Sequence, residues 1–218
     1  LDAAAHVQDL LQRGAAPRPP SRQPSPGERR QLLLAAAIFT LWSAQYFAFM
    51  TWLTQYLTTA MALGRAASVL AYLLPVVVLL GFNILTGWGL RHRLPLIAAL
   101  TVALVSQAAI WFAQPWLSGA AGIVGLVLYG IGAGVTPTCL FHMPHAIARE
   151  LAGSAFFGIL MTGRNIGVFI GPILLAWLIG HESYALGLGW TAAARVIAAL
   201  TLVAAALALL LLREMRRV

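Results

Sequence analysis

The amino-acid sequence predicts an all-α integral membrane protein, built as a bundle of six transmembrane helices. Hydrophobic residues make up 61% of the 218 residues and charged residues only 9%, whereas soluble domains carry about 25% charged residues. The apolar residues fall into six runs, and each run is long enough to cross a hydrocarbon core of about 30 Å as a helix. The sequence does not show the alternation over about ten residues that is typical of a transmembrane β-strand.

The six runs are the elements of the predicted bundle. They cover residues 32–57, 66–90, 94–113, 119–141, 154–180 and 190–212. Backbone N–H and C=O groups in lipid must be satisfied within the protein, so each run is expected to be a helix. Residues 1–31 are expected to form a cytoplasmic linker, and residues 213–218 a cytoplasmic basic tail.

The stretch before the first run is rich in proline, serine and arginine. Its prolines are Pro17, Pro19, Pro20, Pro24 and Pro26. Proline inside a helix removes a hydrogen bond and clashes with the preceding turn, so we expect an extended linker here. The chain opens at Leu1 rather than Met, and we expect this linker to join it to an N-terminal half that this sequence lacks.

The positions of the arginines predict the orientation of the bundle. All fourteen basic residues are arginine, and eleven of them lie in the linker, the tail and the loops around Arg91 and Arg149. The other side has only Arg65 and Arg195, near the ends of runs. The positive-inside rule therefore places both termini in the cytoplasm. The arginine bias indicates a bacterial inner membrane, and orientation rather than nucleic-acid binding explains the net charge of +8.

Arg164 lies about ten residues into the fifth run, which is roughly 15 Å along a helix and close to the bilayer centre. A charge at this depth is costly and usually faces a cavity or a partner. We interpret Arg164 as a residue that binds an anionic substrate, or that gates by pairing with an acid. The alternative is that it caps carbonyl groups or pairs with an acid in the missing half. Asn165 is a second candidate, although adjacent helical positions do not face each other.

Other polar side chains within the runs are candidates for lining a cavity. They are Gln45, Tyr46, Asn83, Tyr129 and Thr136. Hydrogen bonding between helices would explain a buried polar group equally well. Trp52 and Tyr56 lie near the end of the first run, where aromatic residues often form a belt at the membrane interface.

Gly163, Gly167 and Gly171 recur every four residues in the fifth run and form a stripe on which another helix can pack closely. Pro172 removes one backbone hydrogen bond and permits a bend. Tight packing is one interpretation of this stripe. The other is a helix that bends or rocks during function.

Four features, in this order, resemble the major facilitator superfamily. The turn Gly87-Trp88-Gly89-Leu90-Arg91-His92-Arg93 is similar to the family's short arginine-rich loop, and its candidate residues are Gly87, Gly89, Arg91 and Arg93. The acidic residue of that loop is absent, which leaves no basis here for a salt-bridge latch. The other features are Gly130-Ile131-Gly132-Ala133-Gly134 before Pro137, the segment from Gly163 to Pro172, and Gly189-Trp190.

The resemblance implies the second half of a twelve-helix protein, in which solute binds between two six-helix halves near the midplane. It implies a secondary active transporter that moves a small solute by alternating access. The solute would be anionic, polar or an exported drug, and a coupling ion such as H⁺ would drive its movement. The resemblance implies no cofactor.

Two other classes of protein fit the spans. A free-standing six-helix protein, channel-like or degenerate, is one, and the linker argues against it. An intramembrane enzyme is the other, but His181-Glu182 lacks the second histidine of a zinc-protease motif. His142 and His145 show no third ligand, and Pro144 is expected to interrupt the helix between them. No catalytic residue and no metal site are therefore predicted.

Overall fold

A computed structural model describes residues 24–59, 61–147, 154–180 and 189–216. This part of the chain contains six long helices, one 3-10 turn and no strand. The elements are α2 (Pro26–Thr59), α3 (Arg65–Arg91), α4 (Leu96–Ala113), η1 (Gln114–Trp116), α5 (Gly119–Ile147), α6 (Ser154–Gly180) and α8 (Gly189–Met215). All six helices are long and apolar enough to cross a membrane. The prediction of an all-helical chain with six such helices is confirmed.

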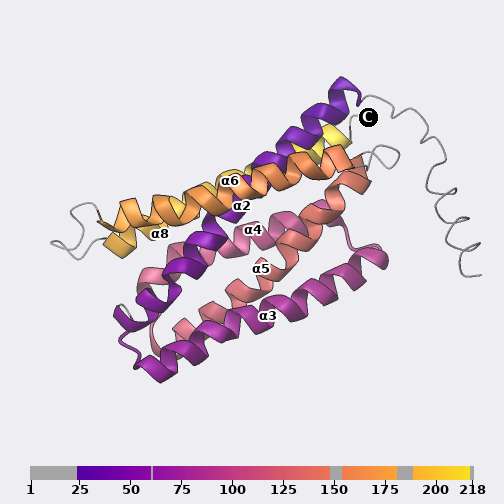
Figure 1. Ribbon diagram of the computed structural model, residues 1–218. Helices are drawn as coiled ribbons and strands as arrows, with labels where there is room; N and C mark the ends of the chain where they lie inside the picture. Colours follow the sequence, from indigo (N-terminus) through magenta and orange to yellow (C-terminus); the bar gives the residue numbers. More distant parts are fainter. Residues whose placement is uncertain (1–23, 60, 148–153, 181–188, 217–218) are drawn as a thin grey trace, which may run out of the picture.

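Successive helices alternate in direction, so the bundle has two ends (Figure 1). We call them the Pro26 end and the Thr59 end, after the first and last residues of α2. An ion pair joins the start of α2 to the end of α8, with 3.4 Å between Nη1 of Arg30 and Oε1 of Glu214. Both helices therefore meet at the Pro26 end.

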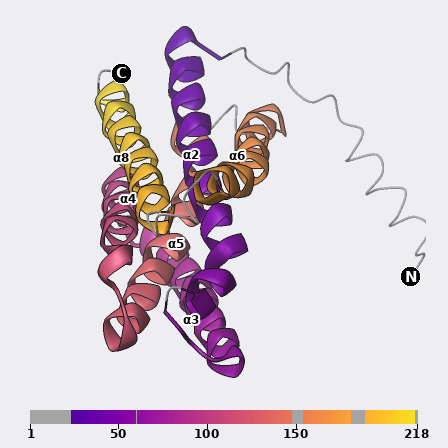
Figure 2. The same cartoon turned by 90° about the vertical axis from the view of Figure 1, so that its left-hand side faces the viewer.

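The helices pack in three close pairs, which are α2 with α6, α3 with α5, and α4 with α8. Figure 1 shows α3 beside α5, and Figure 2 shows α4 beside α8. α2 also contacts α8, α5 and α3, so it lies in the middle of the bundle. One core cluster surrounds Phe39 and Leu104, and a second surrounds Phe49 and Trp111.

The first helix begins at Pro26, so residues 26–31, which were expected to belong to an extended linker, are helical. Ser25 and Glu28 form a reciprocal cap: the backbone N–H of Ser25 donates to Oε2 of Glu28 at 2.7 Å, and that of Glu28 donates to Oγ of Ser25 at 3.2 Å. This capping box starts a helix. Pro26 fits because proline is favoured at the first helical position. The predicted linker up to residue 23 lies outside the described residues.

α5 continues to Ile147, and the expectation that Pro144 interrupts it was wrong. Proline removes only one backbone bond, and Pro144 is buried against the bundle, so packing outweighs that loss. His142 stays on the helix, with its Nδ1 at 2.9 Å from the carbonyl oxygen of Thr138.

Candidate functional site

A buried polar network joins α2, α4 and α5 in the middle of the bundle. At its centre is Gln107 of α4, whose Oε1 accepts from Nε2 of Gln45 at 2.8 Å and from Nε1 of Trp42 at 3.2 Å. Its Nε2 donates to Oγ1 of Thr136 at 2.9 Å and to the carbonyl of Ala103 at 3.0 Å. A glutamine amide has two donor hydrogens and two acceptor positions. All four of those of Gln107 are therefore occupied.

Gln45 is the residue of α2 that takes part most in this network. Its Oε1 accepts from Nε1 of Trp111 at 2.7 Å and from the hydroxyl of Tyr129 at 2.9 Å. The hydroxyl of Thr136 also donates to the carbonyl of Gly132 at 2.9 Å. Gln45, Tyr129 and Thr136, which were candidates for lining a cavity, are all buried. Tyr129 bonds Gln45 directly, and Gln107 links Gln45 to Thr136. Gln45 and Thr136 thus connect helices, whereas Tyr129 also lines a small pocket near the Thr59 end.

Aromatic rings lead outward from this network along α2. The ring of Tyr46 is stacked on Trp42, with centroids 5.2 Å apart and an interplanar angle of 12°. Tyr46 also contacts Phe47 edge to face at 5.2 Å. Both Tyr46 and Phe47 are half-buried, so they form the transition from the sealed core to the surface of the bundle.

Arg164, on α6, lies beside the Phe47 ring of α2. Its guanidinium carbon is 5.6 Å from the centroid of the Phe47 ring, close enough for a cation–π interaction. Its Nη1 donates to Oδ1 of Asn165 at 3.3 Å. The two adjacent residues do meet, because the arginine side chain is long enough to turn back. Arg164 is half-buried and Asn165 exposed, so the pair lies on an accessible face next to Phe47.

Asn83 is held between α3 and α5. The hydroxyl of Thr138 donates to Oδ1 of Asn83 at 2.7 Å. Gly130 and Gly134 of α5 face the same helix, and a Cβ added at Gly134 would lie 2.5 Å from the carbonyl oxygen of Leu79. We call this contact, formed by Gly130, Gly134, Thr138 and Asn83, the α3–α5 seam.

The predicted glycine stripe of α6 faces α2. A Cβ added at Gly163 would lie 2.7 Å from the carbonyl oxygen of Ala36, and one added at Gly167 or Gly171 would overlap the carbonyl of Thr40 or Ala44. Pro172 lies within the continuous helix, and its carbonyl accepts from Nε1 of Trp52 at 3.2 Å. We call this contact the α2–α6 seam, and its residues are Gly163, Gly167, Gly171, Pro172, Ser43 and Trp52.

The arginine-rich turn joins α3 to α4 at the Pro26 end. The backbone N–H groups of His92 and Leu94 both donate to the carbonyl of Gly89 at 2.9 Å. Arg93 has a φ of 68°, in the left-handed region. Arg91 and Arg93 are exposed, and Gly87 and Gly89 are half-buried, so the arginines face outward from a tight turn.

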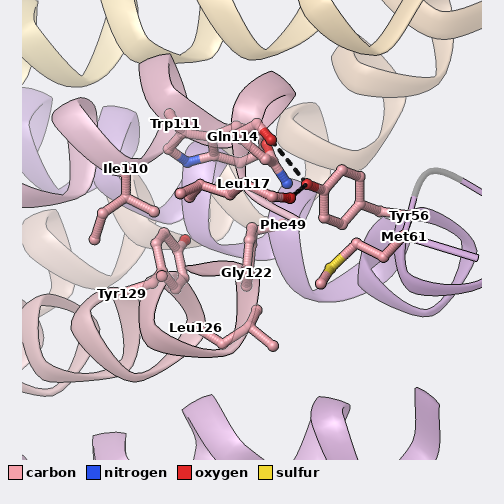
Figure 3. A pocket seen from close by; sticks show the side chains of 11 residues that line it. Phe49, Tyr56, Met61, Ile110, Trp111, Gln114, Leu117, Gly122, Leu126 and Tyr129 are labelled. Carbon is pink, nitrogen blue, oxygen red and sulfur yellow. Dashed lines mark hydrogen bonds between the residues drawn. The ribbon is translucent and has the colours of Figure 1, made fainter. Parts of the chain in front are cut away.

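A small pocket lies near the Thr59 end (Figure 3). Its cavity volume is about 20 Å³, enough for about one water molecule. The hydroxyl of Tyr56 donates across it to the carbonyls of Gln114 at 2.9 Å and Leu117 at 3.3 Å. Tyr56, which was predicted to lie in an interface belt, is buried between helices, and its hydroxyl donates to carbonyls of the chain.

Sequence reasoning missed Gln107 and Trp111. Both carry polar groups on one face of a single apolar run, and their four-residue spacing was the available signal. Within the described residues, no group of three histidine, cysteine, aspartate or glutamate side chains lies close enough together to hold a metal ion.

The chain was compared with protein-family models and with curated proteins. No family model matches it, and no curated protein does.

Proposed function

We propose that this chain is one six-helix half of a secondary active transporter of the major facilitator type. The observation that carries the proposal is the pairing of α2 with α6, α3 with α5, and α4 with α8. Suppose that the first three helices, α2, α3 and α4, correspond in order to the last three, α5, α6 and α8. Replacing each helix by its counterpart then gives the same three pairs again. Two three-helix repeats would produce this pattern, and such repeats are nested in each half of these transporters.

The directions of the helices support an inverted repeat. α2 starts at the Pro26 end, whereas α5, its counterpart, starts at the Thr59 end. Asn83 and Pro172 also occupy matching positions, each eight residues before the end of a 27-residue helix. Each accepts a hydrogen bond from a side chain of the helix packed on it, Thr138 or Trp52.

The face around Arg164 is the proposed contact with solute. Arg164 offers a cation beside the ring of Phe47, and a cation left in lipid at this depth is costly. The sequence has no Asp or Glu between Glu28 and Glu150 or between Glu150 and Glu182. The charge of Arg164 is therefore proposed to meet an anionic or polar solute, or an acid of an N-terminal half that covers this face.

The site of a coupling ion is proposed to lie outside this chain. A proton carrier of the carboxylate type would have to lie in the N-terminal half, because the central parts of the six helices contain no carboxylate. Both termini are proposed to be cytoplasmic, in a bacterial inner membrane, since eleven of the fourteen arginines lie on that side.

The test is uptake of labelled anionic and neutral solutes by the full native protein in proteoliposomes. We expect saturable uptake of an anionic or polar solute. Arg164→Gln should raise its half-saturation concentration by about tenfold or more, because a hydrogen bond to a charged group contributes about 1.5–3 kcal/mol. Arg164→Lys should have a smaller effect.

Arg65→Gln is the matched control, because Arg65 is exposed at the start of α3. Absence of saturable uptake, or an unchanged half-saturation concentration in Arg164→Gln, would contradict the proposal. The native polypeptide should also have about twice the mass of 23.3 kDa. A mass near 23.3 kDa would favour a free-standing six-helix protein instead.

A further inference from the structure

An apolar groove runs along the outside of the bundle between α4 and α8, which lie side by side (Figure 2). Its volume is about 430 Å³. The floor is formed by Ala108 and Ala198, which are only 2% and 3% exposed, whereas the walls include Phe112 and Leu202, which are 54% and 52% exposed. The groove exists because two alanines from each helix line it between larger side chains such as Phe112 and Leu202.

One charged residue lines this groove, and it lies toward the Thr59 end. Arg195 is exposed and lies six residues after the start of α8, which is about 9 Å along the helix. Because α4 and α8 run antiparallel, Phe112 lies at the same end of the groove as Arg195. Val105 and Leu202 lie at the other end, about 10 Å deeper.

Aromatic rings indicate how deep in the bilayer the Arg195 end of the groove lies. Phe112 and Trp116 contact each other with centroids 5.6 Å apart, and Trp116 is exposed. Exposed tryptophan at a helix end is typical of the headgroup level of a bilayer. Arginine side chains reach this level from within the membrane. The groove therefore begins at headgroup depth with a cation and continues apolar toward the midplane.

We propose that this groove binds a glycerophospholipid of the surrounding leaflet, with one acyl chain over Ala108 and Ala198 and the phosphodiester on the guanidinium of Arg195. Charge complementarity identifies the occupant. An apolar channel with one cation at its mouth matches a long chain with an anionic head, and guanidinium binds phosphate oxygens in a bidentate manner. The inference needs only a chain embedded in a bilayer and does not depend on the transport function.

A neighbouring groove provides an internal control. It lies between α4 and α5, has a volume of about 510 Å³, and is lined by apolar residues that include Ala113, Ala121 and Leu128. No charged residue lines it. Lipid chains that fill it are therefore expected to show no preference for the headgroup, in contrast to the groove beside Arg195.

The selectivity follows from the headgroup charge. Phosphatidylglycerol presents its phosphodiester without a competing cation, whereas phosphatidylcholine has its own quaternary ammonium beside the phosphate. The groove should therefore retain phosphatidylglycerol in preference to phosphatidylcholine. Salt should weaken this preference, because the contact lies near the aqueous interface.

The experiment uses the full protein, extracted from bilayers with equal amounts of dioleoyl phosphatidylglycerol and dioleoyl phosphatidylcholine. Retained lipids are counted by native mass spectrometry. Arg195→Gln should weaken retention of phosphatidylglycerol by about tenfold, equivalent to about 1.4 kcal/mol, and Arg195→Lys should retain most of it. Ala199→Phe, at an exposed position in the groove, should reduce retention of both lipids.

Ala121→Phe is the matched control, because it places the same ring in the uncharged groove and should leave the preference for phosphatidylglycerol unchanged. Equal retention of the two lipids by the unaltered protein would overturn the proposal, as would unchanged retention in Arg195→Gln. If Ala199→Phe instead converts a dimer to a monomer without changing lipid retention, a second copy of the chain occupies the groove and the lipid proposal is wrong.

Discussion

The α2–α6 seam and the α3–α5 seam are built from the same backbone contact but differ in their polar side chains. In both, glycines spaced by four residues meet backbone carbonyls of the facing helix, and in both the glycines belong to the later three helices. In the α3–α5 seam, Thr138 donates to Asn83 at 2.7 Å. In the α2–α6 seam, the bond from Trp52 to the carbonyl of Pro172 is longer, at 3.2 Å.

Ser43 makes the contrast sharper. Its hydroxyl is fully buried in the α2–α6 seam and has no hydrogen-bond partner among the described residues. A buried polar group without a partner costs free energy. The α3–α5 seam is thus closed by a short bond between side chains, whereas the α2–α6 seam contains an unsatisfied hydroxyl on the residue that faces Gly167. The two helix pairs therefore pack through glycines in the same way, but only the α3–α5 pair is joined by a short hydrogen bond between side chains.

The largest effect is expected where a side chain would meet backbone. Gly167→Leu would force a Cβ into the carbonyl of Thr40, so α2 and α6 would have to separate. Overpacking of this kind costs about 1–3 kcal/mol or more. We expect a clearly lower thermal unfolding midpoint for the purified protein in detergent, followed by tryptophan fluorescence.

Gly158→Leu is the control in the same helix, because nothing lies within 4 Å of a Cβ added at Gly158. Gly134→Leu tests the other seam, where the added Cβ would lie 2.5 Å from the carbonyl of Leu79. The seams share their packing if Gly134→Leu and Gly167→Leu lower the midpoint similarly. An equal loss in Gly158→Leu would show that the effect has nothing to do with either seam.

A smaller effect is expected from the bond that closes the α3–α5 seam. Thr138→Val keeps the shape of the side chain but removes the donor to Asn83. Hydrogen bonds between membrane helices contribute about 0.6 kcal/mol on average, so we expect a loss of about 0.5–1 kcal/mol in urea or thermal unfolding.

Thr162→Val makes the same chemical change without an interhelical bond, because Thr162 is exposed and its hydroxyl donates to Gly158 within α6. It should leave stability almost unchanged. If both variants behave alike, the Thr138–Asn83 bond does not distinguish the two seams.

The sequence was sufficient to predict the helices but not their polar connections. Six apolar runs located six helices because length and hydropathy are local properties of the chain. The start of α2 has its own sequence signal, because Ser25 and Glu28 have the spacing of a capping box, but the prolines around it favour an extended linker. Proline disrupts a helix when it lies in the helix interior, whereas Pro26 stands at the first position of α2, where proline is favoured.

The centre of the polar network could not be predicted in this way. Gln107 bonds to side chains 62 and 65 residues earlier and 29 residues later in the chain. No periodicity within α4 reveals such partners, since they depend on how three helices meet. The same applies to Gln45 and Tyr129, whose residue types indicated a polar cavity. They bond to each other within the network, and Tyr129 also lines the small pocket.

The smallest effect is expected from Ser43→Ala. Because the hydroxyl has no partner in this structure, its removal should leave the thermal midpoint unchanged or raise it slightly, by less than about 1 kcal/mol of stability. Ser106→Ala is the matched control, because the hydroxyl of Ser106 donates to the carbonyl of Ala103 at 2.9 Å. If Ser43→Ala instead destabilises the protein as much as Thr138→Val does, the hydroxyl has a partner and the two seams do not differ. A different outcome would be unchanged stability of Ser43→Ala together with lower solute uptake. The hydroxyl would then find its partner in a second arrangement of α2 against α6, and the α2–α6 seam would be the one that moves during transport.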